Sequence, residues 1–208
     1  MPVLTVGLVF ETFDTYPRDE GEPIDAHVEF EPESTIEALE SAIAFLGHRP
    51  VRLGSPLSLL EAAAKEGLAG VDVAFNLAEG FGGRNREAWA PVVLDMGGVP
   101  TIGSDALALS LSLDKLWANR HVAAAGVPIA KQTAFADPSE VADAALPALF
   151  PLFVKPRWEG TAKGIRASSR VEDREALVAE VERVTATYRQ PALARPSLRD
   201  RSRAFSPL

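Results

Sequence analysis

Lys155 stands directly after an apolar run, Phe150 to Val154, that predicts a buried strand. Pro156 follows and should end the strand, so the lysine side chain is expected at the carboxyl end of a sheet. An ammonium group beside buried residues needs a partner of opposite charge. A phosphate group would satisfy it as a compact charge, and a solvated lysine at a strand end is the alternative.

A polar loop that contains glycine, Glu159 to Gly164, comes next along the chain. Gly160 and Gly164 allow the backbone to approach a ligand closely. The loop amides, the Thr161 hydroxyl and the Lys163 ammonium could together surround phosphate oxygens. An ordinary hairpin turn has the same composition, so both interpretations stay open.

Lys115 lies in the first turn of a predicted helix, directly after Asp114. The Asp114 carboxylate can accept hydrogen bonds from the free amides at the start of that helix. A cation is unfavourable in a first turn, because the helix dipole is positive there. The position of Lys115 therefore points to a ligand, and a solvated surface lysine is the alternative.

The glycine-rich turn Glu79 to Gly83 is a second candidate anion site, since it leads into a helix carrying Arg84 and Arg86. It does not match the G-x-G-x-x-G pattern, so no dinucleotide site is predicted. A tight turn with solvated arginines is the alternative. Glu29 belongs to an acidic cluster before a predicted helix, where the dipole alone favours negative charge.

Four predicted strands alternate with helices over the first hundred residues. The strands are expected at residues 3–10, 51–53, 71–75 and 99–102. Such alternation implies parallel strands joined by right-handed crossovers. The fold class is therefore α/β, with an N-terminal doubly wound parallel sheet that binds ligands at the carboxyl ends of its strands.

The pattern changes near Ser104, where we place a domain boundary. Helices are expected beyond it at residues 114–125, 137–147 and 171–188, and strands at residues 129–135, 150–155 and 165–168. We predict one domain over residues 1–104 and an α+β domain over 105–193. Residues 194–208 are rich in Arg, lack apolar periodicity, and are expected to form a disordered or aberrant tail that packs on nothing.

Composition excludes several classes of protein. The chain has 208 residues, no Cys, three His and a formal net charge of −8. Disulfide scaffolds, thiolate zinc sites and Cys nucleophiles are therefore excluded, and no metal ligand is predicted. The acidic balance argues against a nucleic-acid partner. No apolar stretch is long enough to span a membrane, and the expected compartment is the cytoplasm.

Several short motifs in order resemble the D-alanine–D-alanine ligase branch of the ATP-grasp superfamily. The resemblance covers roughly residues 1–193. The motifs that carry it are Phe75 to Gly80, Gly83 to Ala88, Gly97 to Ser104, Leu113 to Lys115, Ala124 to Pro128, and Phe150 to Pro156 with the loop at 159–164.

The resemblance implies a pre-ATP-grasp domain followed by an incomplete ATP-grasp domain. It implies a ligase that uses ATP and Mg²⁺ to join two amino-acid substrates for cell-wall precursors. By position, Lys115 and Lys155 look like the two phosphate-binding lysines, and Gly160 to Gly164 looks like the loop that closes over ATP. Thr161 and Ala162 stand where the family usually has two serines. Glu29 is the candidate contact of the first substrate's amine.

Two departures from the family pattern matter. Asn76 to Gly80 replaces a segment of well-studied members that contains His-Gly, so another amino acid or small carboxylate remains open as substrate. Nothing after Leu193 resembles the family's C-terminal half, which supplies the magnesium carboxylates. A truncated chain is thus expected to ligate poorly. A noncatalytic remnant that binds a partner and a small-ligand module are the alternatives, and uncovered apolar surface predicts self-association.

Overall fold

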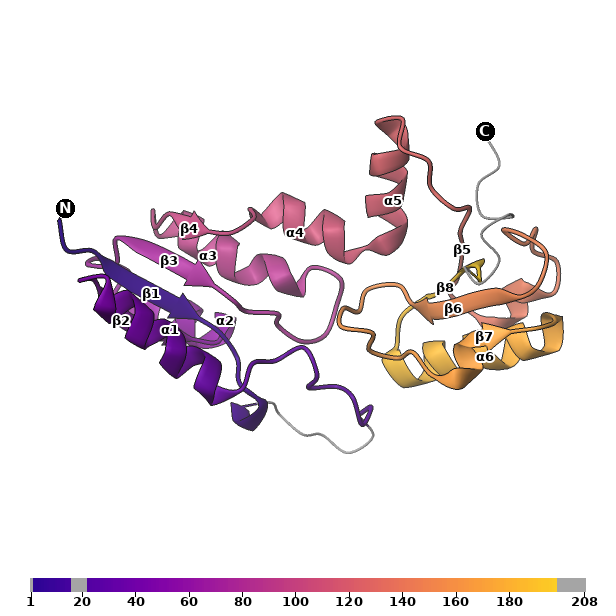
Figure 1. The fold of residues 1–208 in the computed structure, drawn as a ribbon, viewed down its shortest axis with the longest axis horizontal. Coiled ribbons are helices and arrows are strands. Elements are labelled where there is room, and N and C mark those ends of the chain that lie inside the picture. The colour runs from indigo at the N-terminus through magenta and orange to yellow at the C-terminus, as the bar shows by residue number, and fades with distance from the viewer. Residues whose placement is uncertain (1, 16–21, 198–208) are drawn as a thin grey trace. The chain divides into compact units, whose positions relative to one another are not determined.

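The structure is a computed structural model, and it describes residues 2–15 and 22–197 (Figure 1). The described chain forms two compact units. The first unit holds residues 2–15 and 27–110, and the second holds residues 22–26 and 111–197. The division falls between Ser110 and Leu111, past the predicted boundary near Ser104.

The first unit contains a four-stranded parallel sheet with the order β2-β1-β3-β4. Its strands are β1 (Thr5–Val9), β2 (Arg49–Gly54), β3 (Val73–Asn76) and β4 (Thr101–Ile102). Gly7 in the central β1 lies opposite Val51 on one side and Ala74 on the other. The prediction of an α/β fold with a parallel sheet is confirmed.

Helices pack on both faces of this sheet. They are α1 (Glu33–Phe45), α2 (Pro56–Lys65) and α3 (Trp89–Met96), with 3₁₀ turns at Phe13–Thr15 and Arg86–Ala88. Neighbouring residues of a strand point to opposite faces. Leu8 accordingly packs with Ile36 of α1, and Val9 packs with Leu59 of α2 and Leu94 of α3.

The second unit contains a four-stranded antiparallel sheet with the order β5-β8-β6-β7. Its strands are β5 (Thr133–Phe135), β6 (Leu152–Pro156), β7 (Arg170–Val171) and β8 (Ala192–Pro196). Its helices are α5 (Lys115–Ala124) and α6 (Arg174–Tyr188), and 3₁₀ turns lie at Pro138–Val141 and Ala167–Ser169. Helix α4 (Ala106–Leu113) spans the division between the units.

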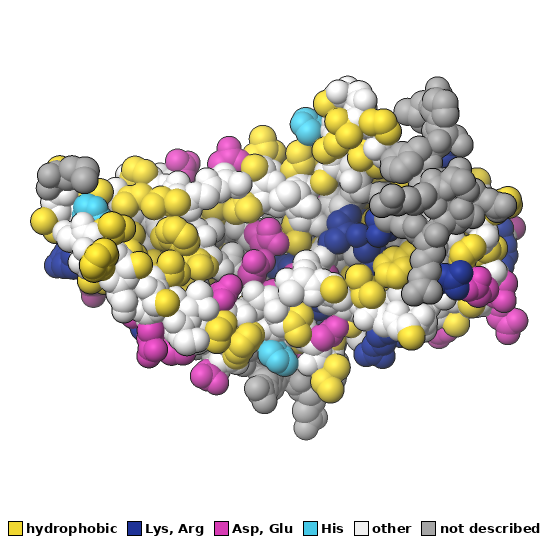
Figure 2. All heavy atoms as spheres, in the orientation of Figure 1, with side chains coloured by type: hydrophobic (Ala, Val, Ile, Leu, Met, Phe, Trp, Pro, Cys, Tyr) yellow, Lys and Arg dark blue, Asp and Glu magenta, His cyan; other side chains and the backbone are white. Residues whose placement is uncertain are grey.

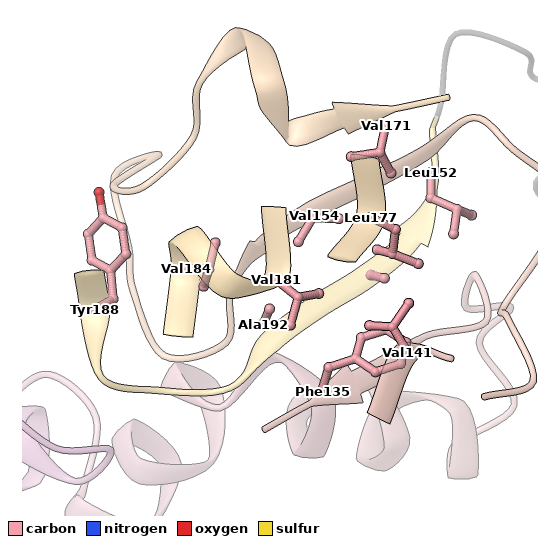
Figure 3. Close-up of a cluster of buried hydrophobic side chains, with 11 residues drawn as sticks. Phe135, Val141, Leu152, Val154, Val171, Leu177, Val181, Val184, Tyr188 and Ala192 are labelled. Atoms are coloured by element: carbon pink, nitrogen blue, oxygen red, sulfur yellow. The ribbon is translucent and has the colours of Figure 1, made fainter. Parts of the chain in front are cut away.

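Helix α6 covers one face of the second sheet. Leu177, Val181 and Val184 of α6 point toward Leu152 and Val154 of β6 (Figure 3). All five side chains are fully buried, so this interface is the core of the second unit. The helical spacing of the α6 residues was visible in the sequence, and it forms the expected apolar face.

Three predictions for the second unit are wrong. Strand β8 includes residues 194–196 and lies between β5 and β6, so this part of the chain is not a tail. The chain has only a 3₁₀ turn, Pro138–Val141, where a helix over residues 137–147 was expected. A 3₁₀ turn and β7 replace the strand predicted at 165–168. The rest of the predicted tail, residues 198–208, lies outside the described residues.

The error at β8 has a local cause. Ala192, Ala194 and Pro196 of this strand lie on the α6 side, and neither alanine nor proline gives the hydrophobic pattern of a buried strand. Arg195 and Pro196 look like loop residues, although the sheet buries Pro196. Neighbouring strands on both sides override the weak local propensity.

None of the helices in the described residues is long and apolar enough to cross a membrane.

Candidate functional site

Lys155 lies near the carboxyl end of β6, as the sequence predicts. It is paired with Leu193 of β8, and Phe153 is paired with Arg195. Residues directly opposite each other in an antiparallel pair share a face, as do alternate residues of one strand. Since Leu152 and Val154 face α6, the Lys155 side chain stands on the other face of the sheet.

The surroundings of Lys155 are cationic. Its ammonium makes no hydrogen bond or ion pair with any described residue. Burial, and then the charges of Arg195 and Lys115, lower the pKa of Lys155 to about 8. A half-buried amine beside two other cations fits an anionic ligand. On the face drawn in Figure 2, Lys and Arg side chains gather beside the lower end of α5.

Lys115 begins α5 after the cap that the sequence predicts. The Asp114 carboxylate accepts from the amides of Leu116 and Trp117, both at 3.2 Å. Arg157 donates to both Asp114 oxygens, at 2.7 and 2.8 Å. Burial raises the pKa of Asp114, but the hydrogen bonds from Arg157 and the amides outweigh it and leave the pKa lowered.

The Lys115 ammonium is directed toward the segment that leads into the loop at 159–164. It donates to the carbonyl of Arg157 at 3.4 Å and to the carbonyl of Glu159. The two lysines predicted to bind phosphate are thus near enough for Lys115 to depress the pKa of Lys155.

The loop at 159–164 is not an ordinary turn. Thr161 and Ala162 both have positive φ, of 45° and 59°, which costs a non-glycine residue about 1–2 kcal/mol. Lys163 forms a 3.0 Å ion pair with Glu159 inside the loop. The positive charge of Lys163 is therefore neutralised within the loop itself.

Asp25 ties this loop to α6. One of its oxygens accepts from the Gly164 amide at 2.8 Å, and both accept from the Tyr188 hydroxyl, at 2.9 and 3.0 Å. Burial, and then the Asp25 carboxylate, raise the pKa of Tyr188. Sequence reasoning missed Asp25, because an acidic residue in a long polar segment gives no signal of a distant partner.

A separate cluster of acidic residues lies in the first unit. Arg86 donates to both oxygens of Glu29, at 3.0 and 2.9 Å. The alternative interpretation of this turn, with solvated arginines, does not hold for Arg86, which is buried. Glu29, the candidate amine contact, is likewise buried. Neither the sequence of the turn nor the sequence around Glu29 indicated that Arg86 and Glu29 form an ion pair.

Glu11 and Glu79 border the same turn. Glu11 accepts from the amides of Glu79 and Gly80, at 3.2 and 3.5 Å, while burial raises its pKa. Burial, then the charges of Glu87 and Glu29, raise the pKa of Glu79 to about 7. The first unit therefore holds a carboxyl group that titrates near neutrality.

A large cavity opens in the first unit near the carboxyl ends of β1 and β2. Its volume is about 1180 Å³, and its walls are mainly apolar. Among the residues that line it are Phe10, Glu11, Arg52, Leu57, Phe81 and Trp89. Parallel α/β sheets bind ligands at this edge.

Metal ligands are not gathered in the described part of the chain. No group of three or more His, Cys, Asp or Glu side chains there could hold a metal ion.

Comparison with curated proteins gives matches to ligases. A D-alanine–D-alanine ligase of Halorhodospira halophila is 36% identical over 131 residues, or 63% of this chain and 40% of that protein. One from Mycobacterium sp. (strain KMS) is 33% identical over 135 residues, or 64% of this chain and 35% of that protein. This chain thus matches well under half of the length of these relatives. No family model matches it.

Solved structures show the same fold. A D-alanine–D-alanine ligase from Bacillus anthracis, complexed with ATP, has a TM-score of 0.61 and 17% identity, and the match covers 94% of this chain and 57% of that one. D-alanyl-alanine synthetase A from Vibrio cholerae has a TM-score of 0.63 and 15% identity, with 95% and 60% covered. At these identities the likeness concerns the fold.

Proposed function

Because this chain is a D-alanine–D-alanine ligase-like protein of the ATP-grasp superfamily, we propose that its second unit binds the phosphate groups of ATP. The single observation that carries the proposal is Lys155. It is a half-buried ammonium with no acidic partner among the described residues and with other cations beside it. Such a group is costly unless an anion neutralises it.

The other phosphate contacts follow from position. Lys115 is directed toward the segment before the loop at 159–164, and the strained Thr161 and Ala162 lie within that loop. Backbone strain of this kind is found at sites that clamp a ligand. We propose that Gly160 and Gly164 let the loop close over the nucleotide, with the Thr161 hydroxyl facing its phosphates. Lys163 would join them by exchanging its ion pair with Glu159 for a phosphate oxygen.

The reaction we propose is that of a carboxylate–amine ligase. The terminal phosphoryl group of ATP is transferred to a carboxylate oxygen, and ADP leaves. The amine of a second substrate then attacks the acyl carbon and phosphate departs, so a new amide bond forms. We infer amino-acid substrates and a role in cell-wall precursor synthesis from the names of the relatives. The chain covers well under half of these relatives, so the complete activity belongs to this proposal.

Glu29 is the proposed contact of the first substrate's amine. Since Arg86 donates to both of its oxygens, an incoming ammonium would have to share or replace Arg86. The Glu79 carboxyl group interacts electrostatically with Glu29. Its loss or gain of a proton would therefore change the net charge around Glu29.

Mg²⁺ is implied by the family, and the described residues do not fit it on their own. They contain no group of three or more potential metal ligands. We therefore derive no step through a metal ion.

Measuring ATP affinity by calorimetry tests the proposal. Lys155→Met should weaken ATP binding at least tenfold, because it removes a charge-assisted phosphate contact. Lys131→Met is the matched control, because Lys131 is exposed. Equal affinity in the wild type and Lys155→Met would contradict the proposal. D-alanine-dependent ADP release in the same two proteins tests the ligase reaction itself.

The large cavity favours a second candidate function, a small-ligand module in the first unit. Its volume of about 1180 Å³ and apolar walls would accept a molecule with an apolar body. Trp89 lines the cavity, so a bound ligand should change its fluorescence. A ligand that alters emission in the wild type but not in Trp89→Phe, with ATP binding absent, would favour this candidate.

A further inference from the structure

Arg195 shares a sheet face with Lys155. It lies directly opposite Phe153, and Lys155 is two residues further along the same strand as Phe153. Directly opposite residues share a face, and diagonal neighbours on that face are within reach of long side chains. The Arg195 guanidinium stands 5.7 Å from the centre of the Phe153 ring, so the aromatic ring supports it beside Lys155.

The Arg195 side chain has unused donors. Its Nε atom is buried and has no hydrogen-bond partner. It forms no ion pair with any of the residues that the structure describes. A buried donor without an acceptor costs free energy, and a second cation beside it adds repulsion. Both costs are removed by an anion that bridges the two side chains.

We propose that Arg195 is a further phosphate-binding residue, which forms with Lys155 a two-cation clamp for the phosphate chain of a nucleotide. The planar guanidinium of Arg195 can donate hydrogen bonds to two phosphate oxygens at once, while the ammonium of Lys155 provides a compact positive charge. This inference rests on the proposed function, because it assigns another residue to the same site. Burial and the charge of Arg195 lower the pKa of Lys155, as expected when two cations lie close together with no anion between them.

A purely structural role for Arg195 makes the opposite prediction about stability. If the side chain only covers Phe153, its removal lowers the melting temperature of the free protein and leaves anion binding unchanged. In a clamp, removal of one cation relieves repulsion, so the melting temperature of the free protein stays the same or rises.

The test measures binding of ATP, tripolyphosphate and adenosine to the whole chain by calorimetry. Arg195→Gln should weaken ATP and tripolyphosphate binding at least tenfold and leave adenosine binding unchanged. Arg195→Lys should recover part of the lost affinity, since it keeps the positive charge but not the planar guanidinium. The melting temperature of each ligand-free protein is measured alongside.

Arg170→Gln is the matched control. Arg170 of β7 lies opposite Phe153 on its other side, so it shares the same face. It is exposed, however, and it already forms an ion pair with Glu172. Its replacement should leave the affinity for all three probes unchanged.

Two results would overturn the clamp. Arg195→Gln that binds ATP and tripolyphosphate as tightly as wild type refutes the clamp and leaves the proposed function standing. An equal loss of adenosine binding also refutes it, because Arg195 would then act on the nucleoside or on folding. A folded wild type that binds neither ATP nor tripolyphosphate refutes the proposed function as well.

Discussion

Arg86 donates from one guanidinium nitrogen to both carboxylate oxygens of Glu29, and each side chain is only 3% exposed. The two residues are 57 positions apart in the chain, so their pairing fixes the segment before α1 against the glycine-rich turn after β3. A buried pair of this kind is costly to break, because the remaining charge stays desolvated.

Breaking the pair should therefore destabilise the first unit. Arg86→Met is expected to lower the free energy of unfolding by about 3–5 kcal/mol, measured by urea denaturation. Arg84→Met serves as the control, because Arg84 is exposed in the same turn. The double variant Glu29→Leu, Arg86→Met should recover much of the loss, since no lone charge is left. A loss below about 1 kcal/mol in Arg86→Met would mean that water reaches Glu29.

Glu79 gives the first unit a pH dependence of stability. Its pKa is raised from 4.5 to about 7 by burial, then by Glu87 and Glu29, with Arg86 opposing. Between these two values the folded protein holds a proton on Glu79 that the unfolded chain has released. The free energy of unfolding should therefore fall as the pH rises from about 4.5 to about 7.

Urea denaturation at several pH values across this window measures the effect. Glu79→Gln cannot ionise and should show a flatter profile than wild type. Glu11, whose pKa is also raised, remains in both proteins, so the difference between the two profiles isolates Glu79. Parallel profiles would rule out an elevated pKa at Glu79.

The sequence predicts features that depend on local pattern. Asp114 caps α5 as expected, because capping needs only an acceptor before the first helical turn. Lys155 was placed correctly, because an apolar run before a lysine and a proline marks the end of a buried strand. The parallel direction of the strands in the first sheet follows from the alternation of strands and helices.

Features that depend on distant partners could not be predicted. Glu29 was assigned to a helix dipole, yet its partner Arg86 comes from another turn. Arg195 was placed in a tail, because only pairing with β6 reveals that it belongs to a strand. In both cases the long-range contact decides the environment of the charge, and one sequence carries no signal of it.

Asp25 holds the loop at 159–164 against α6, and its removal should loosen this loop. Asp25→Ala leaves the Gly164 amide and the Tyr188 hydroxyl without their acceptor, which costs about 1–3 kcal/mol. Limited proteolysis should then cut the loop faster than in wild type. A double-mutant cycle with Tyr188→Phe should give a coupling energy of at least about 0.5 kcal/mol. Additive effects would show that the hydroxyl contact contributes nothing.

Gly164 is the position where this loop tolerates no side chain. Its φ is +79°, and an added Cβ would lie 2.4 Å from Cγ of Pro156 and 3.1 Å from the Tyr188 ring. Gly126 has a similar φ of +83°, but an added Cβ there would meet nothing within 4 Å. Gly126→Ala therefore measures the cost of the backbone conformation without a steric clash. Both alanine variants should lose about 1–2 kcal/mol from the left-handed backbone. Gly164→Ala should lose about 1–3 kcal/mol more, because Pro156 and Tyr188 belong to packed elements. Denaturation of the two variants measures the difference, and an equal loss would show that the loop moves away from Pro156 at little cost.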